Sequence, residues 1–311
     1  MKHEVIDKVT VFVFPGIGVE LSGHEKTLFS EYTKWYEPFF DEIADVAQLD
    51  FRKLLLSDSL STLSELQSQL FIYAFSAGTA KLCVDNGRQP SCVAGYSFGV
   101  YAALYTLKVL SFSDGILLLD KAYELMNACR EGRDIGMCAV IGLSLEELKS
   151  IIAMNKLNAI NHINSNNEYC HIFGGNREQI ITLNSAALDA EAVNAIGINA
   201  SLPYHLGEFT RQIAEPFTAF CESLLWHDPQ LPLYSTVDCK KLQTKEAIRR
   251  YIVNQLTTPI NWFKTMETLY STGCTHVVEC GPGISLTQNA RFISGTAKWI
   301  NCKNLKNRLR S

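Results

Sequence analysis

The chain has 311 residues, of which 47% are hydrophobic, and its 28 basic and 32 acidic residues give a net charge of -4. This length allows a substantial core at the upper end of what one domain holds, so we expect one large domain with a smaller insertion. The balanced charge argues against nucleic acid as a partner. No run of about 18 apolar residues occurs and the N-terminal MKHEVIDK is charged, so we predict a cytoplasmic protein with no membrane partner.

The first part of the chain alternates between strand and helix patterns. VTVFVF is a continuous apolar run typical of a strand buried on both faces. Helical patterns follow over FSEYTKWYEPFFDEIADV and over LSTLSELQSQLFIYAFSAGTAKLCVDNG, which ends at a suitable C-cap glycine, Gly87. SCVAG at 91–95 is predicted as a second buried strand, followed by the helix VYAALYTLKVL. This alternation indicates a doubly wound or hydrolase-like α/β core with a parallel sheet.

The pattern changes from about residue 131. GMCAVIGL, NAINHIN, YCHIFGG and AVNAIGINA are predicted strands, while SLEELKSIIAMN and REQIITLNSAALDA are predicted helices. Their order is βαββαβ, the ferredoxin-like pattern. We therefore expect residues 131–200 to form a small subdomain inserted into a large α/β domain of residues 1–130 and 201–311. The large domain then continues with a helix around 207–225, the strand LPLYSTVD, a helix from 244, TTPINWFKTMETLYSTG, the strand THVVECGPG and a final helical segment.

Ten cysteines are scattered along the chain without a CxxC or CxxH pair. Many lie in apolar stretches such as MCAVIG, which favours reduced, buried thiols over disulfides or a zinc site. ECGPG lacks the spacing of a dinucleotide fingerprint. We therefore predict no metal and no bound cofactor.

The segment Gly95-Tyr96-Ser97-Phe98-Gly99 is a GxSxG motif between a predicted buried strand and a predicted helix. A nucleophile elbow requires this context, because its sharp turn needs small residues on either side while it exposes the serine hydroxyl. The helix that follows adds oriented N–H groups near the serine. Ser97 is therefore the candidate nucleophile, with a turn serine as the structural alternative.

A serine nucleophile needs a base, and seven histidines are available. His171 and His276 lie in apolar strand patterns and are predicted to be core residues. His162, in NHINSNN, is compatible with a position in a cleft. His205 stands at a strand-to-helix junction in SLPYHLGEF, which is the loop position that a base needs. The pattern alone leaves His205 as the leading candidate among several.

Several segments together resemble the malonyl-CoA:acyl carrier protein transacylase family, which also supplies the acyltransferase domains of polyketide synthases. The matching segments occur in the family's order and cover residues 10–290. They are FVFPGIG, LQSQL, AGYSFGVYAAL, GMCAVIGLSLEEL, INSNNEYCHIFGG, LPYH, PLYSTVD, VNQLTTPINW and ECGPGISL.

The resemblance implies an α/β hydrolase-like fold with a ferredoxin-like insertion, and it assigns roles to particular residues. Ser97 would attack the thioester carbonyl, and His205 would act as general base and then as general acid. A carbonyl at Gln255, in the VxQL segment, would orient the histidine. The backbone N–H groups of Ile17 and Phe98 would form the oxyanion hole. Gln67 matches a family glutamine and is a weaker candidate for the substrate pocket.

The chain departs from the family at the acyl pocket. Malonyl enzymes carry an arginine four residues before a methionine, and aligning that methionine with Met126 places Ala122 at the arginine position. An unpaired malonyl carboxylate is costly to bury, so the departure disfavours malonate-type substrates unless Lys121 turns inward. Tyr96 and Tyr204 directly precede the serine and the histidine, and both are expected to reshape the same pocket.

The resemblance implies phosphopantetheine thioesters, of coenzyme A or of an acyl carrier protein, as substrates and the carrier as partner. We expect transfer of a monocarboxylic acyl group in fatty-acid or polyketide biosynthesis by a ping-pong route through an acyl-Ser97 ester. An acyl-carrier-protein thioester hydrolase, a malonyl transacylase and a non-catalytic docking module are the alternatives. The C-terminal KNLKNRLRS offers Lys303, Lys306, Arg308 and Arg310 to an acidic carrier, although a solvated tail also explains those charges.

Overall fold

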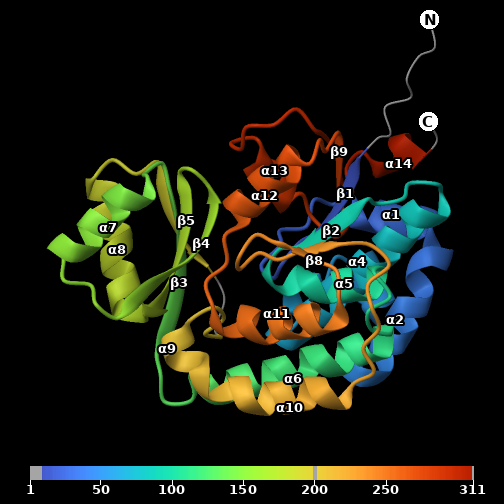
Figure 1. The fold of residues 1–311 in the computed structure, drawn as a ribbon, viewed down its shortest axis with the longest axis horizontal. Helices are drawn as coiled ribbons and strands as arrows, with labels where there is room; N and C mark the ends of the chain where they lie inside the picture. The colour runs from blue at the N-terminus through green and yellow to red at the C-terminus, as the bar shows by residue number, and fades with distance from the viewer. Residues whose placement is uncertain (1–8, 199–201, 310–311) are drawn as a thin grey trace, which may run out of the picture.

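The computed structural model describes residues 9–198 and 202–309, which fold around two sheets (Figure 1). In these ranges the larger sheet has six strands in the order β10-β9-β1-β2-β7-β8, parallel throughout except for the antiparallel pair β7 and β8. The smaller sheet, in the order β4-β5-β3-β6, is antiparallel. The predicted fold class, a parallel-sheet α/β core with a βαββαβ subdomain, is confirmed.

The first strand explains why helices cover both faces of the larger sheet. Side chains of a strand alternate between its two faces. Phe12 and Phe14 pack into the core formed with helices α2, α4, α5 and α6, whereas Val11 and Val13 pack against α12 on the other face. The strands are β1 (Thr10–Phe14), β2 (Cys92–Gly95), β7 (Leu233–Tyr234), β8 (Lys241–Leu242), β9 (His276–Glu279) and β10 (Lys298–Ile300).

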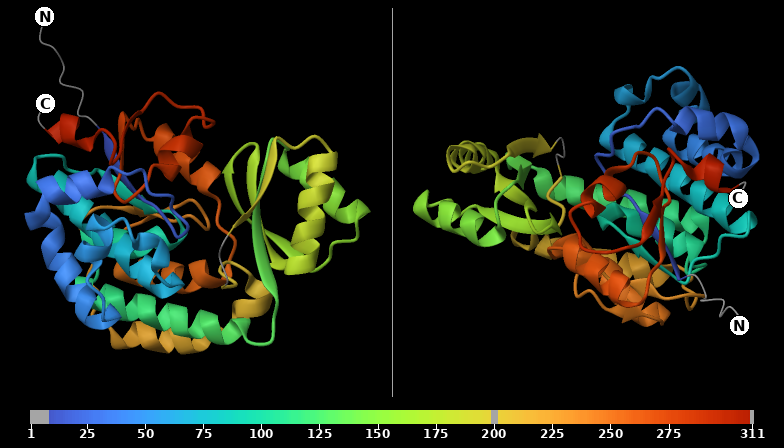
Figure 2. Two further views of the ribbon diagram at one scale, coloured as in Figure 1. Left: turned by 180° about the vertical axis from the view of Figure 1, so that it is seen from behind. Right: turned by 90° about the horizontal axis from the view of Figure 1, so that it is seen from above.

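Helices account for most of the remaining large part, and they lie around the sheet in Figure 2. Their bounds are α1 (Glu25–Glu31), α2 (Thr33–Ala47), α3 (Phe51–Leu56), α4 (Glu65–Asp85), α5 (Val100–Thr106), α6 (Phe112–Arg130), α9 (Gly207–Thr210), α10 (Ala214–Ser223), α11 (Lys245–Thr257), α12 (Trp262–Ser271), α13 (Ser285–Ala290) and α14 (Leu305–Leu309). Short 3₁₀ turns occur at Leu60–Thr62, Ser97–Gly99 and Arg211–Ile213. Within the described chain, no helix is both long and apolar enough to cross a membrane.

The small sheet has one face covered by its own helices and one face turned to the large part. It consists of β3 (Ile135–Ile141), β4 (Ile160–Asn167), β5 (Cys170–Asn176) and β6 (Asn194–Ile198), with α7 (Leu145–Met154) and α8 (Arg177–Asp189). Cys138 and Val140 pack against α7 and α8. Ile135 and Met137, on the opposite face, cluster with Leu206, the residue after His205. The predicted division at residues 131 and 200 stays a prediction, and its second boundary falls outside the described residues.

Some predicted elements differ in extent from those observed. The pattern over 29–46 is split between α1 and α2 at Tyr32, and only Leu233–Tyr234 of LPLYSTVD forms a strand. The edge strand β10 was not predicted, because three residues are too few to show a periodicity. The ten cysteines are free thiols, nine of them buried, as the sequence indicates.

Candidate active site

Ser97 sits on the bend that follows the central strand β2. Its backbone is left-handed, with a φ of 49°, in the short turn Ser97–Gly99 that leads into α5. The flanking glycines are required by close approach: a Cβ on Gly95 would lie 2.3 Å from the Val100 backbone, and one on Gly99 would lie 2.1 Å from the Phe14 carbonyl oxygen. The GxSxG spacing therefore reflects the space available at this bend.

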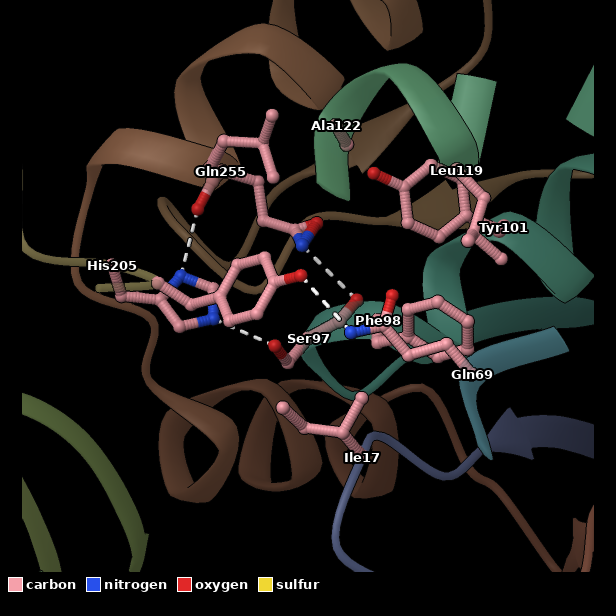
Figure 3. Close-up of a pocket in the computed structure, with 11 residues that line it drawn as sticks. Ile17, Gln69, Ser97, Phe98, Tyr101, Leu119, Ala122, His205 and Gln255 are labelled. Carbon is pink, nitrogen blue, oxygen red and sulfur yellow. Dashed lines mark hydrogen bonds between the residues drawn. The ribbon is translucent and has the colours of Figure 1, made fainter. Parts of the chain in front are cut away.

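His205 reaches the same bend from the segment between β6 and α9. Its Nε2 lies 2.6 Å from the Oγ of Ser97 (Figure 3). Its Nδ1 lies 2.7 Å from the main-chain carbonyl oxygen of Gln255 and 3.2 Å from that of Thr258. A carbonyl oxygen can only accept, so Nδ1 carries the proton and Nε2 is left to accept the serine hydroxyl. Burial of the ring lowers the pKa of His205 to about 4, which keeps this imidazole neutral at neutral pH.

Gln255 contacts both members of this pair. Its main-chain carbonyl accepts from His205, while its side-chain Nε2 donates to the main-chain oxygen of Ser97 at 3.0 Å. The backbone N–H of His205 donates to the carbonyl oxygen of Leu256 at 3.0 Å. The end of α11 thus restrains the nucleophile and the imidazole together.

A narrow pocket lies beside Ser97, with a cavity volume of about 10 Å³. Ile17 and Phe98, the predicted oxyanion-hole residues, both line it. Gln69 donates from Nε2 to the hydroxyl of Tyr204 at 3.0 Å, and both residues line the pocket. The lining residues are Ile17, Gln69, Ser97, Phe98, Tyr101, Leu119, Ala122, Tyr204, His205, Gln255 and Leu256, and none of these described residues is a lysine or an arginine.

Three predicted pocket residues lie elsewhere. Gln67 is used in the capping box of α4, where its Oε1 accepts from the Ser64 N–H, and Gln69, two residues on, faces the pocket instead. The Tyr96 hydroxyl lies in hydrogen bonds with Asn164 and Asn166 of β4, both at 2.8 Å. The Nζ of Lys121 pairs with Glu124 at 2.8 Å rather than turning inward.

Ala122 and Tyr204 do line the pocket. Gln69, Tyr101, Leu119, Leu256 and Thr258 were not predicted. Thr258 lies three residues beyond Gln255, within the VNQLTTPINW segment, so that segment was the available signal for it. Leu256 lies in that segment too, and Gln69 and Tyr101 lie in the matching segments LQSQL and AGYSFGVYAAL. Leu119 lies in none of the matching segments and reaches the pocket only through the packing of α6. In the described residues no group of three or more His, Cys, Asp or Glu side chains is placed to hold a metal ion.

Known proteins match this chain over nearly its full length. A polyketide biosynthesis malonyl CoA-acyl carrier protein transacylase of Bacillus subtilis is 27% identical over 279 residues, covering 89% of this chain and 94% of the relative. A malonyl CoA-acyl carrier protein transacylase of Staphylococcus aureus is 26% identical, covering 94% and 92%. No family model matches the chain.

Solved structures agree with these relatives. A malonyl-CoA:acyl carrier protein transacylase of Xanthomonas oryzae superposes with a TM-score of 0.87 at 25% identity, covering 98% of each chain. A malonyl transacylase solved in complex with its type II polyketide acyl carrier protein superposes with a TM-score of 0.84 at 27% identity, covering 94% of this chain and 96% of the other.

The fold, the serine on the bend after a central parallel strand and the histidine oriented by a main-chain carbonyl together define an α/β acyltransferase. The sequence relatives and the solved structures agree with that class over nearly every described element. Over nearly its full length the chain is similar to malonyl-CoA:acyl carrier protein transacylases, in sequence and in fold.

Proposed function

We propose that the protein moves a monocarboxylic acyl group between a thioester and the phosphopantetheine thiol of an acyl carrier protein through an ester on Ser97. The observation that supports it is a serine hydroxyl 2.6 Å from a neutral, oriented imidazole, beside a pocket lined by described residues without a cation. The carrier is proposed as partner because a related transacylase was solved with its carrier protein.

The first half-reaction forms the acyl-enzyme. His205 Nε2 takes the hydroxyl proton as Ser97 Oγ attacks the thioester carbonyl carbon. The negative oxygen of the tetrahedral intermediate accepts hydrogen bonds from the N–H groups of Ile17 and Phe98. The carbon–sulfur bond then breaks, and His205 returns the proton to the leaving thiolate. In the second half-reaction the imidazole takes the proton of the carrier thiol as the sulfur attacks the ester carbonyl carbon. The bond from that carbon to Ser97 Oγ then breaks, and His205 returns the proton to Oγ.

The pocket wall explains why a monocarboxylic group is proposed. A second carboxylate on the acyl group would need a bidentate cationic partner once it leaves water. The position predicted for that partner is Ala122, and the neighbouring Lys121 is engaged with Glu124 on the helix surface. Leu119 and Leu256 instead make this part of the pocket apolar.

The proposal is tested by the mass of the intact protein after incubation with acetyl-CoA, propionyl-CoA and malonyl-CoA. We expect an acetyl or propionyl adduct that disappears in Ser97→Ala and is more abundant than the malonyl adduct. Holo carrier protein is then added, and acylated carrier is compared with free acid. Acyl appearing mainly on the carrier supports transfer. Free acid formed faster would instead establish the thioester hydrolase.

Malonyl transfer is the second candidate, because the related proteins are named malonyl transacylases. The variant Ala122→Arg separates the two. If Ala122 occupies the place of a carboxylate-binding cation, Ala122→Arg should raise malonyl relative to acetyl acylation by about tenfold or more. The measurement is kcat/KM for coenzyme A release with each thioester. A wild-type malonyl rate equal to or above the acetyl rate would overturn the monocarboxylic proposal.

A further inference from the structure

One buried oxygen in the pocket has no hydrogen-bond partner among the described residues. Gln255 is 3% exposed and lines the pocket, yet its side-chain Oε1 accepts no hydrogen bond there. The orientation of the amide is fixed, because its Nε2 donates to the Ser97 carbonyl oxygen and a flipped amide would place two acceptors together. Buried carbonyl oxygens are normally paired, so the bound substrate is expected to supply the donor.

Two tyrosine hydroxyls lie in the wall of the same pocket. The Tyr204 hydroxyl accepts from Gln69 at 3.0 Å and keeps its own proton to donate. Tyr101 also lines the pocket, and Figure 3 shows its hydroxyl on the side of Ala122. The wall therefore combines an acceptor and two hydroxyls with apolar side chains.

The uncharged lining of this pocket limits which acyl groups can bind there. The described lining residues include no Asp, Glu, Lys or Arg. A carboxylate has no proton for Oε1 of Gln255, and an ammonium group would enter a site without an anion to pair with it. A hydroxyl is uncharged and both donates and accepts. We propose, on the basis of the acyl-transfer function above, that the pocket selects a short hydroxyacyl group whose hydroxyl donates to Oε1 of Gln255 and accepts from a tyrosine hydroxyl.

The test compares thioesters that differ only by a methyl and a hydroxyl group. Glycolyl-CoA is measured against propionyl-CoA, and 3-hydroxypropionyl-CoA against butyryl-CoA. We expect kcat/KM for coenzyme A release to be higher for at least one hydroxyacyl member than for its alkyl isostere, by about tenfold or more. Ratios at or below one for both pairs would overturn the proposal.

Substitutions in the pocket test which side chains cause the preference for hydroxyacyl over alkyl groups. Gln255→Met keeps the main-chain carbonyl and the side-chain length, although it loses the bond to Ser97, so all its rates are expected to fall. The informative quantity is the ratio of hydroxyacyl to alkyl rates, which should approach one. Tyr101→Phe should also lower the ratio, whereas the matched control Tyr105→Phe, which removes a hydroxyl on α5 outside the pocket lining, should leave it unchanged. A ratio in Gln255→Met equal to that of the wild type would exclude the assigned role.

A binding measurement separates this proposal from the proposed function. Ser97→Ala is titrated by calorimetry with each pair of thioesters, so that recognition is read without acylation. Tighter binding of the hydroxyacyl member by about tenfold supports the selectivity even if no acyl-enzyme forms in the wild type. Equal binding together with a clear acetyl adduct on the wild type rejects the hydroxyacyl proposal and leaves acyl transfer standing.

Discussion

The two residues that face each other in the candidate site both have left-handed backbones. Ser97 has a φ of 49° and His205 a φ of 64°. Non-glycine residues in this region each cost about 1–2 kcal/mol. The segment at the end of α11 restrains both, through the Gln255 side chain on the Ser97 carbonyl and the Leu256 carbonyl on the His205 N–H. Eight non-glycine residues of the described chain have left-handed backbones, and these two are the ones that must meet in the site.

The bend has no room for a side chain at Gly99. Gly99→Ala would place its Cβ 2.1 Å from the Phe14 carbonyl oxygen, so the central strand or the turn has to shift. We expect a loss of about 2–4 kcal/mol in the free energy of unfolding and a large loss of Ser97 acylation. Urea denaturation measures the first and intact mass the second. Gly197→Ala is the matched control, since nothing lies within 4 Å of its Cβ. Similar stabilities for the two variants would contradict the steric argument.

The pKa of His205, lowered to about 4 by burial, makes a prediction for the pH dependence of acylation. The imidazole accepts a proton only when it is neutral, and this form dominates above the folded-state pKa. The acylation rate should therefore rise around pH 4 and be nearly flat from pH 5 to 7. A base with the ordinary pKa of 6.5 would lose roughly twentyfold over that range. Single-turnover release of coenzyme A from acetyl-CoA measures it, and a midpoint near 6.5 would show that the ring is not desolvated.

The lowered pKa of His205 also makes the free energy of unfolding depend on pH. Between about pH 4 and 6.5 the unfolded chain binds the His205 proton and the folded chain does not. Stability contributed by this group is therefore present above pH 6.5 and is lost as the pH falls through that window. In His205→Gln, unfolding free energies measured between pH 5 and 7 should vary less with pH than in the wild type.

Helix α4 shows how one element serves both stability and the pocket. Ser64 and Gln67 form a reciprocal capping box at its N-terminus, and Gln69 faces Tyr204 in the pocket. We expect Gln67→Ala to lower the free energy of unfolding by about 0.5–1 kcal/mol while leaving the relative rates for different acyl-CoA substrates unchanged. Gln69→Ala should instead change the relative rates and admit longer acyl chains, because Tyr204 loses its donor and the pocket gains space. Rates for acetyl-CoA to hexanoyl-CoA and thermal unfolding distinguish the two, and altered acyl preference in Gln67→Ala would contradict the structure.

A residue of the site can be predicted from the sequence when the pattern that indicates it lies within one short segment. Ser97 is predicted by a five-residue motif between a strand and a helix, all within one short segment. His205 lies 108 residues away from Ser97 in the chain, and its assignment needed the family resemblance. Helix α4 is buried on nearly all sides from Gln69 to Cys83, so no periodicity indicates which of its side chains faces the pocket. Gln67 was therefore predicted where Gln69 is found.

At the scale of the whole molecule, the site lies where the large part meets the uncovered face of the small sheet. A second groove adjoins it, running from Gly18, the neighbour of Ile17, past Ala139 and Ile196 of the small sheet to Lys303. Lys303 is exposed, whereas Lys306 contacts Glu31 of α1, and Arg310 lies outside the described residues. Among the described C-terminal cations considered for carrier binding, Lys303 lines this groove, and Lys306 and Arg308 do not.

This position makes Lys303 a test of how an acidic carrier approaches. Lys303→Glu should raise KM for the carrier by roughly threefold to tenfold at low salt, because a charge at the rim of an interface acts mainly on association. The rate of Ser97 acylation by acetyl-CoA should stay the same. Lys149→Glu, on α7 at the opposite face of the small sheet, makes the same charge change and should leave both quantities unaltered. Because ions screen such exposed charges, the difference between Lys303→Glu and the wild type should shrink as salt rises to 0.5 M. An unchanged carrier KM at low salt would mean that the carrier approaches over a different face.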